Sequence, residues 1–132
     1  MQNLTRSILL VDDDESYRAI LRHHLQALGY EVLEAADGTE GCDIASRQPL
    51  QLVILDIVMP QSEGLETISR LRREGVRTKI LAISGAGRAR EYLKLARGLG
   101  ADAGLEKIRP ISELLSLVHS LVEDSNPVAC SH

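Results

Sequence analysis

The stretch that decides the fold spans residues 52–60 and reads Leu-Val-Ile-Leu-Asp-Ile-Val-Met-Pro. Its first four residues are apolar and include the branched side chains that strands favour, so we expect a buried strand that ends at Asp56. A carboxylate is energetically unfavourable at the end of a buried strand unless it has a partner, and such a residue usually has a function. Asp56 is therefore the first candidate for a functional residue.

A second apolar run has the same form. Residues 8–11 read Ile-Leu-Leu-Val and end in an acidic cluster, Asp12, Asp13 and Asp14. If both runs are neighbouring strands of one parallel sheet, their acidic ends meet at the same edge. Converging carboxylate oxygens need a cation, and hard oxygen ligands suit Mg²⁺ or the similar Mn²⁺. The two runs together predict a carboxylate–metal pocket.

Strand-length apolar runs alternate with segments of helical periodicity along the whole chain. Five strand–helix units in a row indicate an α/β fold with a parallel sheet covered on both faces. We predict a flavodoxin-like (βα)₅ three-layer sandwich with strand order 2-1-3-4-5, which places both acidic ends at the switch point where ligands bind. The expected strands are 7–11, 30–35, 50–55, 78–83 and 101–105, and the expected helices are 15–28, 39–47, 65–73, 88–99 and 112–122.

The helical periodicity also predicts which side chains face the sheet. The apolar stripe of the first helix comprises Tyr17, Ile20, Leu21, Leu28 and either His24 or Leu25; that of the fourth comprises Ala89, Tyr92, Ala96 and Leu99. Asp14 and Gly29 are expected to cap the two ends of the first helix.

Length and composition favour one domain, here 1–123, followed by a disordered tail, 124–132. The net charge of −4 among 132 residues gives no sign of a nucleic-acid-binding surface. No apolar run approaches the roughly 18 residues that span a bilayer, so no membrane segment is expected. Cys42 and Cys130 match no metal or redox spacing and indicate free thiols in a reducing, cytoplasmic protein.

At this point the motifs match a known family. Over about residues 7–122 the chain resembles the receiver domain of two-component response regulators, the CheY-like superfamily. Four features occur in the family's order: an acidic pair after the first strand, Asp-x-x-Met-Pro after the third, a hydroxyl after the fourth and a lysine after the fifth. In this chain they are Asp12 and Asp13, the segment 56–60, Ser84, and Lys107.

The resemblance implies that Asp56 accepts a phosphoryl group from a histidine kinase or a histidine phosphotransfer protein. It implies Asp13, Asp56 and the backbone carbonyl of Val58 as direct ligands of Mg²⁺, with Asp12 acting mainly through water. Ser84 would hydrogen-bond a phosphoryl oxygen. Lys107 would pair with another phosphoryl oxygen, and with Asp56 before phosphorylation. The domain would then be a phosphorylation-dependent interaction module, with no chemistry expected beyond its own phosphorylation and dephosphorylation.

The chain departs from the family at two positions. The family usually has Lys-Pro with a cis peptide bond, whereas Ile108 follows Lys107 here, so we expect a trans bond. Three residues before the lysine, the family commonly has an aromatic ring that swings inward on activation. Gly104 occupies that position and cannot do so. At Gly85, after Ser84, the chain agrees with the family, and the resemblance implies that this glycine leaves room beside Asp56 for the phosphodonor.

The output partner is expected at the face formed by the fourth helix, fifth strand and fifth helix. Arg90, Lys94 and Arg97 form a basic stripe there, for which a solvated helix face is the alternative explanation. The surplus of Leu and Val in 112–122 could serve homodimerisation.

Two other functions remain open. One is a pseudo-receiver that is not phosphorylated, favoured by Gly104 and the missing Lys-Pro. The other is an aspartyl phosphatase of the haloacid-dehalogenase type, with Asp12 as nucleophile, although no later acidic pair completes such a site.

Overall fold

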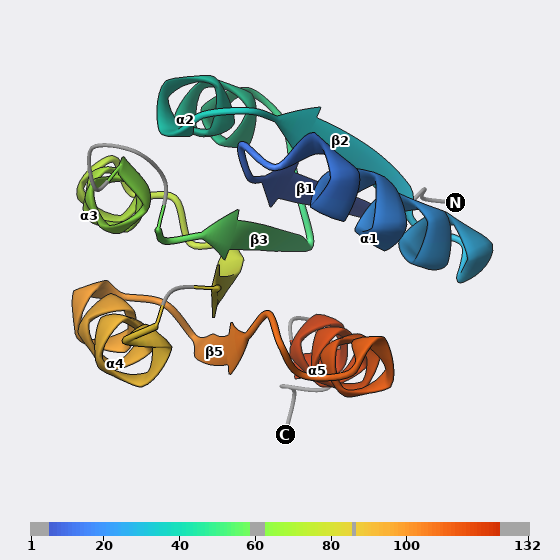
Figure 1. Ribbon diagram of the computed structural model, residues 1–132. Coiled ribbons are helices and arrows are strands. Elements are labelled where there is room, and N and C mark those ends of the chain that lie inside the picture. The colour runs from blue at the N-terminus through green and yellow to red at the C-terminus, as the bar shows by residue number, and fades with distance from the viewer. Residues whose placement is uncertain (1–5, 59–62, 86, 125–132) are drawn as a thin grey trace.

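The protein is a three-layer α/β sandwich in the computed structural model, which describes residues 6–58, 63–85 and 87–124 (Figure 1). Five strands form one sheet in the order β2-β1-β3-β4-β5, and every neighbouring pair is parallel. The predicted fold class and strand order are confirmed. The elements are β1 (Ser7–Val11), α1 (Glu15–Ala27), β2 (Glu31–Ala35), α2 (Gly38–Arg47), β3 (Leu52–Asp56), α3 (Glu63–Arg73), β4 (Lys79–Ser84), α4 (Ala89–Leu99), β5 (Ala103–Glu106) and α5 (Ile111–Asp124).

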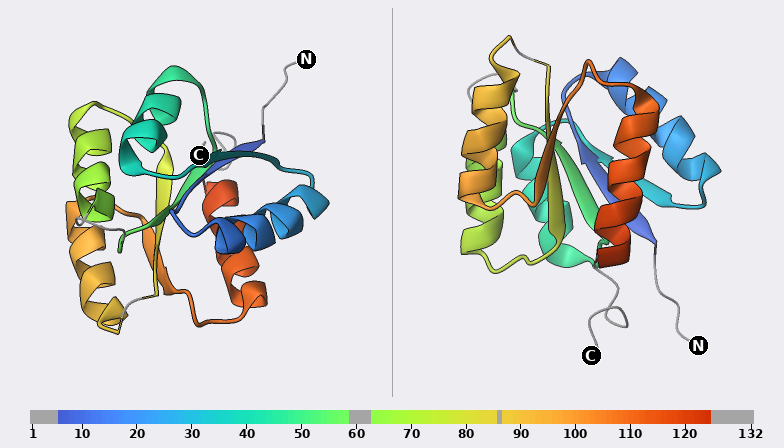
Figure 2. Two further views of the ribbon diagram at one scale, coloured as in Figure 1. Left: turned by 45° about the horizontal axis from the view of Figure 1, so that its top comes forward. Right: turned by 90° about the horizontal axis from the view of Figure 1, so that it is seen from below.

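The sheet is buried on both faces because its strands are apolar on both sides. In β1, Ile8 and Leu10 pack toward α1 and α5, whereas Leu9 and Val11 pack toward α2, α3 and α4. This alternation follows from the two-residue period of a strand. Figure 2 shows the result from below, with α3 and α4 on one side of the sheet and α1 and α5 on the other.

The ends of α1 follow their predicted caps. The Asp14 side chain accepts a hydrogen bond from the backbone N–H of Tyr17 at 3.1 Å, which satisfies one of the donors left unpaired at a helix start. Gly29 follows the helix with a φ of 94°, a conformation that glycine adopts without strain.

The predicted apolar stripes are too wide. Ile20 and Leu28 on α1 are 47% and 52% exposed, and Leu99 on α4 is 41% exposed. In α1 only Leu21 and Leu25 are buried. These helices cover the sheet along a narrow line of contact, and the prediction assigned side chains on its flanks to the core.

In α5, by contrast, the apolar side chains that suggested dimerisation largely serve the core. Leu114, Val118, Leu121 and Val122 are buried, and Leu115 and Leu117 are partly buried against the same cluster. The helix includes Asp124, the first residue of the expected tail, and residues 125–132 lie outside the part that the structure describes.

Candidate functional site

An acidic pocket lies at the carboxyl ends of β1 and β3. These strands are neighbours, with Val11 opposite Leu55, so the residues that follow them come together at one edge of the sheet. Asp12 and Asp56 are only 2% and 4% exposed, whereas Asp13 is exposed. Carboxylate oxygens of these three residues lie within 4.8 Å of one another.

This donor set fits a small divalent cation. Three carboxylates supply hard oxygen ligands from two strand ends, the arrangement that Mg²⁺ and Mn²⁺ favour over the softer sites of zinc or copper. The backbone N–H of Val58 donates to Asp56 Oδ1 at 2.9 Å, which fixes that carboxylate and brings the Val58 backbone to the pocket. Met59 and Pro60 of the same motif lie outside the described residues.

Lys107 closes the pocket from the end of β5. Its Nζ lies 3.2 Å from Asp56 Oδ2 and 2.8 Å from Asp12 Oδ2, so one ammonium bridges both buried carboxylates. It also lies 4.5 Å from the centre of the Tyr17 ring, within range of a cation–π contact. The pairing with Asp12 was not predicted.

The loop holds Lys107 in place without the family's cis-proline. The backbone N–H of Lys107 donates to the Ser84 carbonyl at 2.9 Å, which joins β5 to β4 beside the pocket. No peptide bond in the described residues is cis, in agreement with the expected trans bond before Ile108.

The electrostatics of the pocket are those of crowded carboxylates. Burial raises the pKa of Asp56 to about 6, and the charge of Asp12 adds to the shift, while the Val58 N–H and Lys107 oppose it. Burial also disfavours the ammonium of Lys107, but hydrogen bonds and charges from Asp12 and Asp56 outweigh it and leave the pKa of Lys107 raised. The pocket therefore holds more negative charge than Lys107 alone balances.

Ser84 and Gly85 lie on the neighbouring strand end. Ser84 is fully buried at the last position of β4, and Ile83 before it pairs with Asp56. A Cβ added to Gly85 would lie 3.2 Å from Cδ of Lys107. The glycine therefore lets the aliphatic part of Lys107 pass close to the end of β4. That Gly85 leaves room for a phosphodonor beside Asp56 stays a prediction.

One residue with a positioning role was missed. Arg18 on α1 donates to the backbone carbonyl of Asp12 at 2.5 Å and pairs with Glu34 of β2 at 3.0 Å. Its side chain is only 14% exposed. Arg18 thereby ties the loop that carries Asp12 and Asp13 to the adjacent strand. Its position one helical turn after Asp14 was the available signal.

We expect Arg18→Ala to weaken Mg²⁺ binding by about tenfold, since the loss of a residue that orients metal ligands typically has an effect of this size. Arg22→Ala is the matched control, because Arg22 pairs with Glu34 but has no hydrogen bond to the Asp12 backbone. Thermal denaturation at increasing Mg²⁺ concentrations would measure the Mg²⁺ affinity of both variants. Equal affinity losses in the two would show that Glu34, and not the Asp12 carbonyl, carries the effect.

The packing of α4 on β5 explains the glycine at position 104. A Cβ at this position would lie 3.1 Å from Cδ2 and 3.2 Å from Cβ of Leu93, so the Leu93 side chain lies against the backbone of β5. The space next to the strand, where the family's aromatic ring begins, is therefore filled from α4. A larger residue at 104 would have to displace Leu93.

Comparison with known proteins agrees with this geometry. The model of a family described as the response regulator receiver domain matches residues 8–119. Response regulator MprA of Mycobacterium sp. (strain KMS) is 35% identical over 124 residues, which are 91% of this chain and 52% of the relative. The alkaline phosphatase synthesis transcriptional regulatory protein PhoP of Bacillus subtilis (strain 168) is 31% identical over 129 residues, 97% of this chain and 53% of the relative.

Solved structures give the same result. Response regulator TrrA of Thermotoga maritima, in complex with Mg²⁺ and BeF, is 32% identical with a TM-score of 0.78, covering 89% of this chain and 99% of that one. A CheY-like receiver domain protein of Methanospirillum hungatei JF-1 is 26% identical with a TM-score of 0.84, covering 92% and 97%. In the described part of this chain, no helix is both long and apolar enough to cross a membrane.

Proposed function

The chain belongs to the response regulator receiver domains of two-component systems, and from this premise we propose that Asp56 accepts a phosphoryl group from a histidine kinase or a histidine phosphotransfer protein. One observation carries the proposal: the buried Asp56 carboxylate shares its pocket with Asp12, Asp13 and the ammonium of Lys107. A structural aspartate would not need two further carboxylates beside it.

The transfer requires a carboxylate oxygen to approach a negatively charged phosphoryl group. An Asp56 oxygen forms the new P–O bond, the P–N bond to the donor imidazole breaks, and the imidazole nitrogen keeps the electron pair and takes a proton from solvent. Asp13, Asp56 and the Val58 carbonyl would hold Mg²⁺, with Asp12 acting through water, and the bound ion would neutralise charge on the transferring oxygens.

The residues around Asp56 have distinct roles in this proposal. Lys107 leaves the Asp56 carboxylate and pairs with a phosphoryl oxygen, while Asp12 keeps it nearby. The Ser84 hydroxyl donates to another phosphoryl oxygen. The product is an acyl phosphate, which hydrolyses spontaneously and so suits a transient signal.

The test is phosphorylation with acetyl phosphate and Mg²⁺, followed by intact mass and by reduction of the acyl phosphate with borohydride to mark the modified residue. One phosphoryl group on Asp56 is expected, with none when EDTA removes the metal. A chain that takes no phosphoryl group from acetyl phosphate or from a phosphorylated histidine phosphotransfer protein would be a pseudo-receiver.

The output of the signal is a further part of the proposal. The chain spans about half the length of the curated relatives it matches. Receiver domains act in signalling with histidine kinases and output domains. For this chain we propose a protein output partner at the face formed by α4, β5 and α5. Homodimerisation has less support, since the apolar residues of α5 pack on the sheet.

The two ends of α4 are held differently, which suggests how the signal reaches that face. At the C-terminal end, Arg72 of α3 donates twice to the Gly100 carbonyl, at 3.1 and 2.9 Å, and pairs with Asp102. At the N-terminal end, Arg88 precedes the helix without a side-chain cap. We propose that phosphorylation draws the N-terminal end of α4 toward the pocket while the C-terminal end stays fixed.

Amide hydrogen exchange with and without beryllofluoride would measure this movement. We expect altered protection at Ser84 and over residues 89–94, and little change at the Arg72-bound residues 100–102. Ser84→Ala should reduce the response, because it removes the hydrogen bond that favours the shifted state. A response confined to the loop after Asp56, and equal in Ser84→Ala, would contradict this mechanism.

A further inference from the structure

The ammonium of Lys107 has to be held in place while it changes partners. It lies at the end of a long, flexible stem, and the rotational freedom of such a stem is costly to fix. In the resting pocket two carboxylates hold it, Asp12 at 2.8 Å and Asp56 at 3.2 Å. In the proposed reaction it exchanges Asp56 for a phosphoryl oxygen. A contact that persists through this exchange would keep the ammonium at the pocket.

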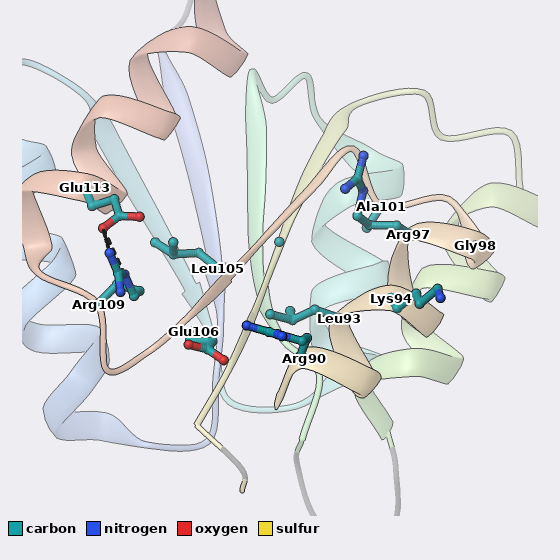
Figure 3. A pocket seen from close by; sticks show the side chains of 11 residues that line it. Arg90, Leu93, Lys94, Arg97, Gly98, Ala101, Leu105, Glu106, Arg109 and Glu113 are labelled. Atoms are coloured by element: carbon teal, nitrogen blue, oxygen red, sulfur yellow. Dashed lines mark hydrogen bonds and ion pairs between the residues drawn. The ribbon is translucent and has the colours of Figure 1, made fainter. Parts of the chain in front are cut away.

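An aromatic ring supplies such a contact, and it comes from α1. The ammonium of Lys107 lies over the ring of Tyr17, with Nζ 4.5 Å from the ring centre. The face proposed for the output partner is different, since none of the described residues that line the hollow over β5, between α4 and α5, is aromatic (Figure 3). The ring that meets the lysine of the pocket therefore belongs to the first helix and not to β5.

The start of α1 fixes the Tyr17 ring. The backbone N–H of Tyr17 donates to Asp14 Oδ1 at 3.1 Å, in the cap that joins the helix to the loop carrying Asp12 and Asp13. The side chain of Tyr17 is partly buried and packs against the apolar cluster between the sheet, α1 and α5. The ring is thus anchored by the core and by the helix cap, and it moves little when the lysine moves.

The Tyr17 phenol is uncharged at neutral pH. Burial raises its pKa, and although Lys107 lowers it, the nearby carboxylates add to the rise. The ring therefore attracts the ammonium through its π face and offers no full charge that would compete with Asp12, Asp56 or a phosphoryl oxygen. This attraction is stronger where water is excluded, and the side chain of Lys107 is only 17% exposed.

We propose that Tyr17 is a positioning residue for phosphoryl transfer, and that its ring holds the Lys107 ammonium beside Asp12 while the ammonium passes from Asp56 to the phosphoryl oxygen. This inference rests on the proposed function, because it assigns the residue that prepares Lys107 for that reaction. The ring limits the freedom that Lys107 gains on leaving Asp56, so less order has to be imposed in the transition state. A side chain of similar bulk without a π face would lose this effect.

The test is the initial rate at which acetyl phosphate and Mg²⁺ label the full chain, followed by intact mass. Tyr17→Leu should be labelled about three- to tenfold more slowly than wild type, because it keeps apolar packing and removes the ring. Tyr17→Phe should have the wild-type rate, since the hydroxyl has no role in the proposal. Pentafluorophenylalanine in place of Tyr17 keeps the shape of the ring and inverts its quadrupole, so this variant should be as slow as Tyr17→Leu.

Tyr30→Leu is the matched control. Tyr30 also lies beneath a cation, with Arg6 at 4.6 Å from its ring centre, but it precedes β2 at the amino ends of the strands, away from the acidic pocket. Tyr30→Leu should be labelled as fast as wild type. Circular dichroism confirms that each variant is folded.

A double-mutant cycle gives a readout that does not depend on phosphorylation. Urea denaturation without Mg²⁺ of wild type, Tyr17→Leu, Lys107→Met and the double variant measures the coupling between ring and ammonium. We expect Tyr17→Leu to lower the free energy of unfolding less in the Lys107→Met background than in the wild type.

The proposal is overturned by equal or faster labelling of Tyr17→Leu, by slow labelling of Tyr17→Phe, by wild-type labelling of the pentafluorophenylalanine variant, or by a cycle without coupling. Faster labelling would mean that the ring holds Lys107 back on Asp56. A wild-type chain that takes no phosphoryl group would refute the proposed function and this role with it. If the wild type is labelled and the Tyr17 variants match it, only the role of Tyr17 is refuted.

Discussion

Asp56→Asn is expected to abolish labelling by acetyl phosphate and Mg²⁺, with a loss of about a thousandfold or more, because the amide cannot supply the attacking carboxylate oxygen. Asp12→Asn should retain slow labelling at Asp56, reduced by about ten- to a hundredfold through weaker metal binding. Asp43→Asn, on the exposed surface of α2, should be labelled as wild type is. The measurement is the phosphorylated fraction over time by intact mass.

The same set of variants separates the proposed function from its alternative. If Asp56→Asn is labelled fully and Asp12→Asn is not, Asp12 is the nucleophile, as in the phosphatase alternative. The resting geometry alone does not separate the two carboxylates, so the labelling has to decide. Oδ1 of Asp12 accepts the backbone N–H of Asp14 and Oδ1 of Asp56 accepts that of Val58, each at 2.9 Å, and Lys107 lies beside Oδ2 of both.

The sequence was sufficient for the fold and for the acidic pocket because both depend on strand order. Each apolar run ends where its strand ends, and parallel strands place those ends at one edge. Once β1 and β3 were assigned as neighbours, the approach of Asp12 to Asp56 followed without any distance being known. Lys107, by contrast, was placed at the pocket by the resemblance to the family, in which a lysine follows the fifth strand.

Features that depend on the distance between elements could not be predicted this way. Periodicity gave the direction of the α1 and α4 stripes but not the width of their contact, so Ile20, Leu28 and Leu99 were assigned to the core. The contact of Leu93 with Gly104 depends on how closely α4 approaches β5. Arg18 reaches the Asp12 carbonyl only because α1 crosses the end of β2, where Glu34 orients the guanidinium.

Without divalent cations, the protein is expected to become more stable as the pH falls from about 7 toward 4.5. The folded-state pKa of Asp56 is about 6, above its unfolded value near 3.9. Between these values the folded state binds more protons than the unfolded state, so the free energy of unfolding rises as the pH falls. A shift of about two units limits this contribution to on the order of 3 kcal/mol.

Asp56→Asn should remove most of that pH dependence and raise stability at pH 7 by roughly 1–3 kcal/mol, since a neutral amide replaces a buried charge. Millimolar Mg²⁺ should stabilise the wild type at pH 7 and the variant much less. Glu34 acts in the opposite direction to Asp56, because its arginine partners lower its pKa despite burial. It therefore stabilises the folded state at neutral pH, and this stabilisation is lost only at lower pH. Urea denaturation across this pH range measures each contribution.

Parallel stability curves for wild type and Asp56→Asn would contradict this prediction. They would show that burial does not destabilise the charged Asp56 carboxylate, and the electrostatic argument for a metal at this site would fail.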